Sequence, residues 1–213
     1  MLSKLYPILD SSFLPVGDSP RKERLRTLAA ELLSSGATLL QYRNKTGTEA
    51  EVLEDAGVLR VAAPPGPCVL ILNDYPELVA QTGFDGAHVG QQDLAPDAAR
   101  ALLGPDLMLG LSTHNPEQLS AADLTSADYL AIGPVFATAS KRNPDPIVGI
   151  EGVQRARALT KKPLVAIGGI TLENCRAVID AGADSIAVIS SLFADTGGRP
   201  PGKIASDFFA KLR

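Results

Sequence analysis

Short apolar runs alternate with amphipathic stretches from one end of the chain to the other. The apolar runs are rich in Leu, Ile and Val, which is typical of parallel strands that are buried on both faces. The pattern predicts strands at Leu5–Asp10, Thr38–Arg43, Val69–Asn73, Gly86–Val89, Met108–Ser112, Tyr129–Gly133, Leu164–Ile167 and Ser185–Ser190. Helices are expected between them, for example at Arg21–Ser34 and at Leu172–Ala181, with Thr171 as the N-cap of the second.

Eight strand–helix units in 213 residues predict an α/β fold with parallel strands. A single (β/α)8 TIM barrel accounts for this number, and we expect residues 1–213 to form one catalytic domain of that kind. An open, doubly wound sheet is the structural alternative. No G-x-G-x-x-G follows the first expected strand, so the sequence gives no support to a dinucleotide site.

Composition narrows the classes of partner. The net charge of −4 argues against a broad nucleic-acid surface, which would need an excess of Lys and Arg. No apolar run reaches membrane-spanning length, and the first residues lack a signal-peptide pattern, so we expect a cytoplasmic protein. Cys68 and Cys175 lack the paired spacing of a zinc site and are expected to be reduced and apolar in role.

Polar side chains recur where the expected strands end, which is the end of a (β/α)8 barrel that carries the chemistry. They follow the second to the eighth of the predicted strands. The candidates are Gln41, Arg43, Lys45, Asn73, Asp74, His88, Gln91, Asp93, Ser112, His114, Thr138, Ser140, Lys141, Gly168, Gly169, Ser190 and Ser191.

Two carboxylates, Asp74 and Asp93, follow neighbouring strands, which lie about 5 Å apart in a sheet. Hard oxygen ligands at such a separation suit Mg2+, which commonly takes one or two carboxylates with waters and substrate phosphates. The alternative for each residue taken singly is a helix N-cap.

Three cations, Arg43, Lys45 and Lys141, come from two different connections. Arg offers a planar fork to phosphate oxygens and Lys a compact charge, so together with Mg2+ they could hold a diphosphate. Any one of them alone would be interpreted as a solvated surface charge.

A second anion site is indicated by the segment VAIGGI, Val165–Ile170, which ends a strand and opens a helix. Glycine lets backbone N–H groups approach an anion closely. The next expected strand ends at Ile189–Ser191, and the loops after strands 7 and 8 often bind phosphate in these barrels.

A series of segments, in order along most of the chain, resembles the thiamine phosphate synthase family. The segments are QYRNK (Gln41–Lys45), ILND (Ile71–Asp74), DGAHVGQQDL (Asp85–Leu94), GLSTH (Gly110–His114), YLAIGPVFATASK (Tyr129–Lys141) and VAIGGI (Val165–Ile170). The family loop commonly reads Thr-x-Thr-Lys, and Ser140 keeps the hydroxyl of the second Thr.

The resemblance implies a role for each matching residue. Asp74 and Asp93 would bind Mg2+, and Arg43, Lys45, Ser112 and Lys141 would be catalytic. The aminopyrimidine diphosphate would be held by Gln41, Tyr42, Arg43, Asn44, Lys45, Asn73, Ser112 and Lys141. The thiazole phosphate would be held by Thr138, Ala139, Ser140, Gly169, Ile189 and Ser190.

The implied reaction is a dissociative substitution in which diphosphate leaves the pyrimidine methylene and the thiazole nitrogen then attacks that carbon. The implied partners are these small molecules, with no nucleic acid or membrane and a possible homo-oligomer. The thiazole substrate could also carry an extra carboxylate.

Three other functions stay open. Thiazole tautomerase, a related barrel, would use His114 for proton transfer and would not need the complete diphosphate and metal set. Another phosphate-binding barrel enzyme would explain the GGI segment but not QYRNK. A non-catalytic phosphate-binding or thiamine-sensing barrel would be expected to lack a metal carboxylate or a site Lys, whereas both kinds are present.

Overall fold

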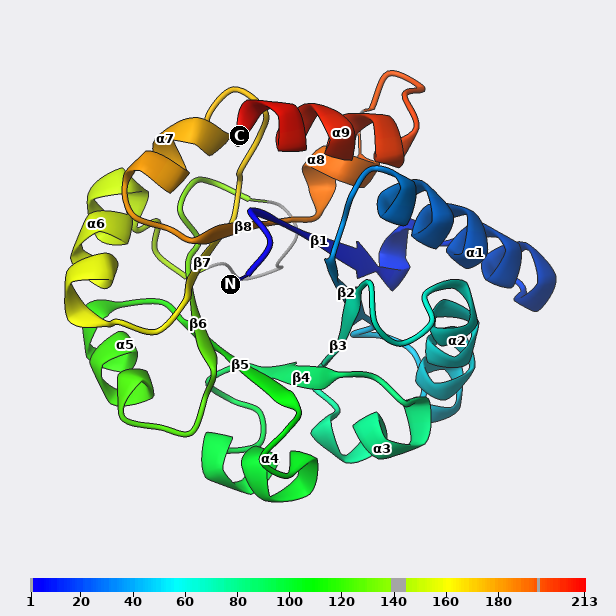
Figure 1. The fold of residues 1–213 in the computed structure, drawn as a ribbon, viewed down its shortest axis with the longest axis horizontal. Coiled ribbons are helices and arrows are strands. Elements are labelled where there is room, and N and C mark those ends of the chain that lie inside the picture. The colour runs from blue at the N-terminus through cyan, green and yellow to red at the C-terminus, as the bar shows by residue number, and fades with distance from the viewer. Residues whose placement is uncertain (1, 139–144, 195) are drawn as a thin grey trace.

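A closed barrel of eight parallel strands, each bonded to its sequence neighbours, forms the centre of the molecule (Figure 1). The computed structural model describes residues 2–138, 145–194 and 196–213. The barrel closes between β8 and β1, where Tyr6 pairs with Ala187. The strands are β1 (Leu5–Asp10), β2 (Leu39–Arg43), β3 (Val69–Asn73), β4 (Gly86–Val89), β5 (Met108–Thr113), β6 (Tyr129–Ile132), β7 (Leu164–Ile167) and β8 (Ser185–Val188). The predicted (β/α)8 barrel is confirmed.

Helices surround the barrel on its outside (Figure 1). They are α1 (Asp18–Ser34), α2 (Glu49–Ala62), α3 (Val79–Thr82), α4 (Pro96–Leu103), α5 (Pro116–Asp123), α6 (Gly149–Leu159), α7 (Cys175–Asp180), α8 (Ser190–Phe193) and α9 (Pro201–Lys211), with the 3-10 turns η1 (Ser11–Phe13) and η2 (Pro76–Leu78). Expected boundaries differ from the structure by one to three residues at α1, β2, β5, β6, β8 and α7. The eighth strand ends at Val188, and α7 begins after Asn174 rather than Thr171, because residues 172–174 form a turn closed by the Asn174 side chain on the Thr171 N–H.

Strand alternation divides the buried side chains into two layers. Outward residues such as Leu40, Leu72 and Leu130 pack against the helices. Inward residues fill the barrel interior, which comprises Tyr6, Ile8, Leu39, Ile71, Tyr129, Ala131, Val165 and Ala187. Because successive side chains point to opposite faces of a strand, this layering fixes which polar residues at the strand ends face the barrel axis.

The N-terminal end of the barrel carries a repeated ion pair. An Asp immediately before each of β4, β6 and β8 accepts from a backbone N–H of the preceding strand and from an Arg on the helix before that strand. The three sets are Asp85 with Leu70 and Arg60, Asp128 with Leu109 and Arg100, and Asp184 with Leu164 and Arg157. Each set ties a helix to two strands, so this end of the barrel serves stability.

We expect Asp184→Ala to lower the free energy of unfolding by about 1–3 kcal/mol, because it leaves the Leu164 N–H without its acceptor and removes the carboxylate partner of Arg157, which keeps only the Thr160 and Lys162 carbonyls. Urea unfolding followed by circular dichroism measures the change. Asp180→Ala is the matched control, because its pair with Arg176 lies on the surface of α7 and should change the same quantity by less than about 0.5 kcal/mol. Equal effects of the two variants would contradict the role given to Asp184.

One further sequence expectation concerns the two cysteines. Cys68 and Cys175 are both free and buried, and burial raises the pKa of the Cys68 thiol to about 11.

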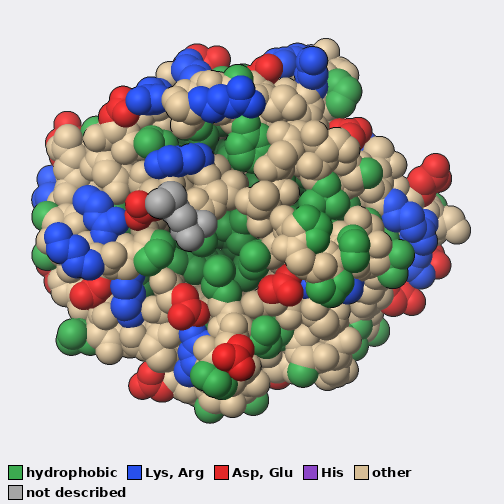
Figure 2. Space-filling model, viewed as in Figure 1, with side chains coloured by type: hydrophobic (Ala, Val, Ile, Leu, Met, Phe, Trp, Pro, Cys, Tyr) green, Lys and Arg blue, Asp and Glu red, His purple; other side chains and the backbone are tan. Residues whose placement is uncertain are grey.

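In the view of Figure 2, which has the N-terminus near its middle, apolar side chains gather over the centre of the barrel and most charged ones lie farther out. No helix among the described residues has both the length and the apolar character needed to cross a membrane.

Candidate active site

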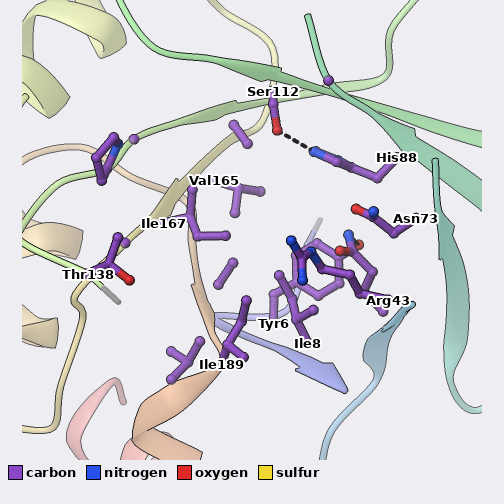
Figure 3. Close-up of a pocket in the computed structure, with 18 of the residues that line it drawn as sticks. Tyr6, Ile8, Arg43, Asn73, His88, Ser112, Thr138, Val165, Ile167 and Ile189 are labelled. Carbon is purple, nitrogen blue, oxygen red and sulfur yellow. Dashed lines mark hydrogen bonds between the residues drawn. The ribbon is translucent and has the colours of Figure 1, made fainter. Parts of the chain in front are cut away.

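A cavity opens at the C-terminal ends of the strands, and residues from all eight strands or the connections after them contribute to its wall. The close-up in Figure 3 shows Arg43, Asn73 and His88 on one side, with Thr138 on the other. The predicted site residues that line it are Gln41, Arg43, Lys45, Asn73, Asp74, Asp93, Ser112, Thr138, Gly169, Ile189 and Ser190. The structure therefore brings most of the predicted set to one cavity.

Tyr42 and Asn44 lie elsewhere. Tyr42 sits between inward-facing Gln41 and Arg43, so it points outward, where its hydroxyl donates to the Asp55 carboxylate. Asn44 is buried, and its Oδ1 accepts from the Ser11 hydroxyl at 2.9 Å and from the Gly47 N–H at 2.8 Å. Both residues hold the QYRNK segment in place rather than line the cavity.

Three predicted residues, Ala139, Ser140 and Lys141, fall outside the described part of the chain. Thr138, directly before them, lines the cavity, and so does Asp145, directly after residue 144. The connection that contains the three residues thus begins and ends at the cavity wall.

Arg43 forms an ion pair with a residue that the sequence analysis missed. Its guanidinium donates to Oδ2 of Asp10, the last residue of β1, and only 5% of Asp10 is exposed. The other oxygen of this carboxylate accepts from the Ser12 N–H at 2.9 Å. A strand-end polar residue in the first strand was the available signal, because β1 and β2 are neighbours in any barrel order.

Lys45, Asp74 and Asp93 form a charged group on the cavity wall. Lys45 Nζ pairs with Asp74 Oδ2, and Asp93 lies close enough to Asp74 to interact with it. Burial raises the pKa of the Asp74 carboxyl, Lys45 acts in the opposite direction, and the like charge of Asp93 raises it further. Two carboxylates held this close repel each other unless a cation lies between them.

Neither carboxylate caps a helix. Asp74 has φ 70°, a left-handed conformation that non-glycine residues rarely adopt, and its N–H donates to the His88 carbonyl at 2.8 Å. The caps of η2 and α4 are Tyr75 and Ala95. Strained backbone at such a position is a common feature of functional sites.

The donor set fits a hard divalent cation. The described residues hold no cluster of three or more His, Cys, Asp or Glu that could bind a metal alone. Asp74 and Asp93 supply two carboxylates at the edge of an open cavity, which is the ligand supply that Mg2+ uses when waters and substrate phosphates complete its shell.

The loops after β7 and β8 form the opposite wall. Gly168 and Gly169 have φ values of 102° and 64°, and the Gly169 carbonyl accepts from Asn174 Nδ2 at 3.0 Å. A Cβ on Gly169 would overlap the Phe136 Cβ and the Ala137 carbonyl. The Ser191 hydroxyl donates to the Ile170 carbonyl at 2.7 Å, which joins the two loops.

At the floor of the cavity, polar side chains form a connected chain inside the barrel. Gln41 Nε2 donates to the Tyr6 hydroxyl at 3.0 Å, and the Tyr6 and Tyr129 hydroxyls are 3.0 Å apart. His88 lies 3.0 Å from the Tyr129 hydroxyl through Nδ1 and 2.7 Å from Ser112 Oγ through Nε2 (Figure 3). Burial raises the pKa of both tyrosines and lowers that of His88 to about 4.

His114 also lines the cavity but belongs to a different set of contacts. Its Nδ1 lies 2.7 Å from the Gly133 carbonyl, and its Nε2 lies 3.5 Å from Asp145 Oδ2. Because a carbonyl oxygen only accepts, Nδ1 of His114 carries a proton.

Comparison with known proteins identifies the family of the chain. The thiamine monophosphate synthase family model matches residues 5–192. A thiamine-phosphate synthase of Koribacter versatilis is 53% identical over 211 residues, which are 99% of this chain and 96% of that protein. One from Agrobacterium fabrum is 41% identical over 195 residues, 89% of this chain and 86% of that protein.

A solved structure gives the same result for the fold. Thiamine phosphate pyrophosphorylase from Pyrococcus furiosus superposes with a TM-score of 0.82 at 30% identity, covering 98% of this chain and 95% of that one. The family model and the near full-length relatives are decisive, since they span the barrel strands and most of the cavity wall. The chain therefore belongs to the thiamine monophosphate synthase family and is a transferase.

Proposed function

We propose that this chain joins an aminopyrimidine diphosphate to a thiazole phosphate, in a reaction that requires Mg2+ and yields thiamine phosphate and diphosphate. The observation that carries the proposal is the division of one cavity into two walls of different chemistry. One wall holds two carboxylates and a Lys from the ends of β2, β3 and β4, and the other holds the glycine loop after β7 and the start of α8.

The charged wall suits the diphosphate. Lys45 and Arg43 are the cations, and each is held by a carboxylate, Asp74 or Asp10, that fixes its position before a ligand arrives. Asn73, which is 7% exposed, and Ser112 offer neutral polar groups beside them. Preorganised cations stabilise a departing anion without having to reorient during the reaction.

The residues that would hold Mg2+ are Asp74 and Asp93, and the ion would neutralise diphosphate oxygens as the leaving group departs. Metal binding would also relieve the repulsion between the two carboxylates, which the structure offsets in part with Lys45.

The glycine wall suits a phosphate monoester. Positive φ at Gly168 and Gly169 exposes backbone that a side chain would cover, and Ser190 and Thr138 add hydroxyls to the same cavity. A thiazole held there by its phosphate would face the pyrimidine across the cavity. The bond between the pyrimidine methylene and the diphosphate oxygen breaks, and the thiazole nitrogen donates its electron pair to that carbon.

The chain's contribution is positioning, charge stabilisation and exclusion of water, since the substitution needs no protein nucleophile. Val165, Ile167 and Ile189 are apolar side chains that lie between the two walls (Figure 3). They provide a surface for the flat rings and keep water from a cationic methylene.

The test is an assay of purified protein with hydroxymethylpyrimidine diphosphate, thiazole phosphate and Mg2+, measuring thiamine phosphate and diphosphate. We expect metal-dependent product that falls at least about 100-fold in Asp93→Ala, because one of two metal carboxylates is lost. Asp97→Ala, an exposed carboxylate on α4, is the control and should keep full activity. Absence of product from folded wild-type protein would refute the proposal, and tautomerase activity would then be assayed with His114→Gln.

A further inference from the structure

The side chains of the cavity floor form one path of hydrogen bonds from Gln41 through Tyr6, Tyr129 and His88 to Ser112. They come from β2, β1, β6, β4 and β5, so the path crosses the interior of the barrel. The exposed fraction is 2% for Gln41, 1% for each Tyr and 7% for His88. Each buried polar hydrogen on such a path needs an acceptor, because a buried donor without an acceptor destabilises the folded state.

The direction of the path follows from its first member. The Gln41 amide nitrogen can only donate, so the Tyr6 oxygen accepts from it. Among the described residues, the one remaining partner of the Tyr6 hydroxyl is Tyr129, so Tyr6 donates its single proton there. Tyr129 then donates its own proton to its other partner, Nδ1 of His88.

His88 thereby receives a hydrogen bond at Nδ1 and must carry its proton on Nε2, since a neutral imidazole has one donor and one acceptor nitrogen. Nε2–H donates to Ser112 Oγ across 2.7 Å. The Ser112 oxygen is thus occupied as an acceptor within the protein, and its hydroxyl proton is left for a partner in the cavity that Ser112 lines.

We propose that this path is a one-way hydrogen-bond relay that holds His88 as the Nε2–H tautomer and makes Ser112 a donor to the substrate, with Tyr6, Tyr129 and His88 as positioning residues. The same direction leaves Gln41 Oε1 as an acceptor at the other end. The cavity floor therefore offers an acceptor at Gln41 and a donor at Ser112, a pair that recognises a ligand with a polar N–H near the first and a ring nitrogen or phosphate oxygen near the second.

Gly110 provides the space that the relay needs. It pairs with His88 on one side and with Tyr129 on the other, so the three residues lie side by side at one level of the barrel. A Cβ on Gly110 would overlap the Tyr129 ring and His88 Nδ1. The absence of a side chain at this position lets the Tyr129 hydroxyl reach across β5 to the imidazole.

The tautomer is measured in the ligand-free protein by long-range 15N–1H NMR at about pH 8, above the ordinary His pKa of about 6.5. The chain has two histidines, and His114 is the internal control because its Nδ1 bears a proton. We expect His88 to be protonated on Nε2, opposite to the control, with the His114→Gln spectrum assigning the signals. A His88 signal of the Nδ1–H type would reverse the relay and overturn the proposal, whatever reaction the enzyme catalyses.

A kinetic arm, which rests on the proposed function, tests the link to Ser112. We expect Tyr129→Phe to lower kcat/KM by about 10-fold in the wild-type background and by less than about 2-fold in Ser112→Ala, since Tyr129 acts through that hydroxyl. The NMR spectrum of each variant reports whether it is folded. Equal fold-changes of Tyr129→Phe in the two backgrounds would overturn the positioning role while leaving the proposed function in place.

Discussion

Asp74→Asn is expected to reduce kcat/KM by at least about 100-fold while leaving the protein as stable as the wild type at pH 7. The loss of activity follows from the proposed metal role, because the amide oxygen keeps the shape of the ligand but not its charge. Lys45 would lose its ion-pair partner, but 46% of its side chain is exposed and water can solvate it. Steady-state assays with Mg2+ and both substrates measure the change in activity.

The stability of this variant follows from the sign of the Asp74 pKa shift. Burial raises the folded-state pKa above the ordinary 3.8, so the folded state binds this proton more tightly than the unfolded state. Stability from this group is therefore present below about pH 3.8 and is lost as the pH rises through the raised pKa. Asn has no such proton. The melting temperature of the variant relative to that of the wild type should therefore increase as the pH rises across this range.

Melting curves in metal-free buffer between about pH 3 and pH 7 measure this difference. Asp97→Asn is the control for the loss of one carboxylate from the surface, because Asp97 is exposed on α4 and does not line the cavity. A variant that is inactive and also much less stable than the wild type at pH 7 would mean that Asp74 serves the fold, contrary to the metal role.

The sequence predicted the barrel well because each buried parallel strand is an apolar run. Such a run can be identified without knowing which strands pair with it. Where a run continued beyond the strand, the prediction erred. Ile189 extends the apolar run of β8, but the backbone leaves the sheet at Val188 and starts α8 at Ser190. The hydrophobic pattern reports burial, and Ile189 lines a cavity instead of a strand interior.

The alternation of side chains along a strand explains which of the predicted site residues line the cavity. Gln41 and Arg43 are two residues apart and both line it, whereas Tyr42 between them points to Asp55 on α2. The family resemblance alone grouped all three. Applying the two-residue period of a strand to the QYRNK motif places Tyr42 on the opposite face from Gln41 and Arg43, and this step needs only the sequence.

The relay could not be predicted, because the three residues that connect Gln41 to Ser112 look like core residues in the sequence. Tyr6, His88 and Tyr129 all lie within apolar runs that form strands, where a polar side chain is usually packed and satisfied in the core. His88 is buried and has two hydrogen-bond partners, yet it also lines the cavity. Only the register that sets Gly110 between His88 and Tyr129 shows that these residues meet.

Gly169→Ala is expected to raise the KM for thiazole phosphate by at least about 10-fold and to change the KM for the pyrimidine diphosphate by less than about 2-fold. The new Cβ would overlap Phe136 and the Ala137 carbonyl, so the glycine loop must move away from the wall on which the thiazole phosphate is proposed to bind. The charged wall at Lys45 belongs to other strands. Initial rates with each substrate varied in turn measure the two constants.

Gly83→Ala is the control that separates this effect from the general cost of placing Ala in a left-handed backbone conformation. Gly83 has φ 66°, almost the same as the 64° of Gly169, but a Cβ there meets nothing within 4 Å, and the residue ends α3 away from the cavity. Both variants should lose about 1 kcal/mol of stability from the left-handed conformation, and Gly169→Ala more because of its clash. Only Gly169→Ala should alter the thiazole constant. A normal KM for thiazole phosphate in folded Gly169→Ala would place the phosphate away from this loop, and a parallel rise for both substrates would mean that the loop supports the whole cavity rather than one of its walls.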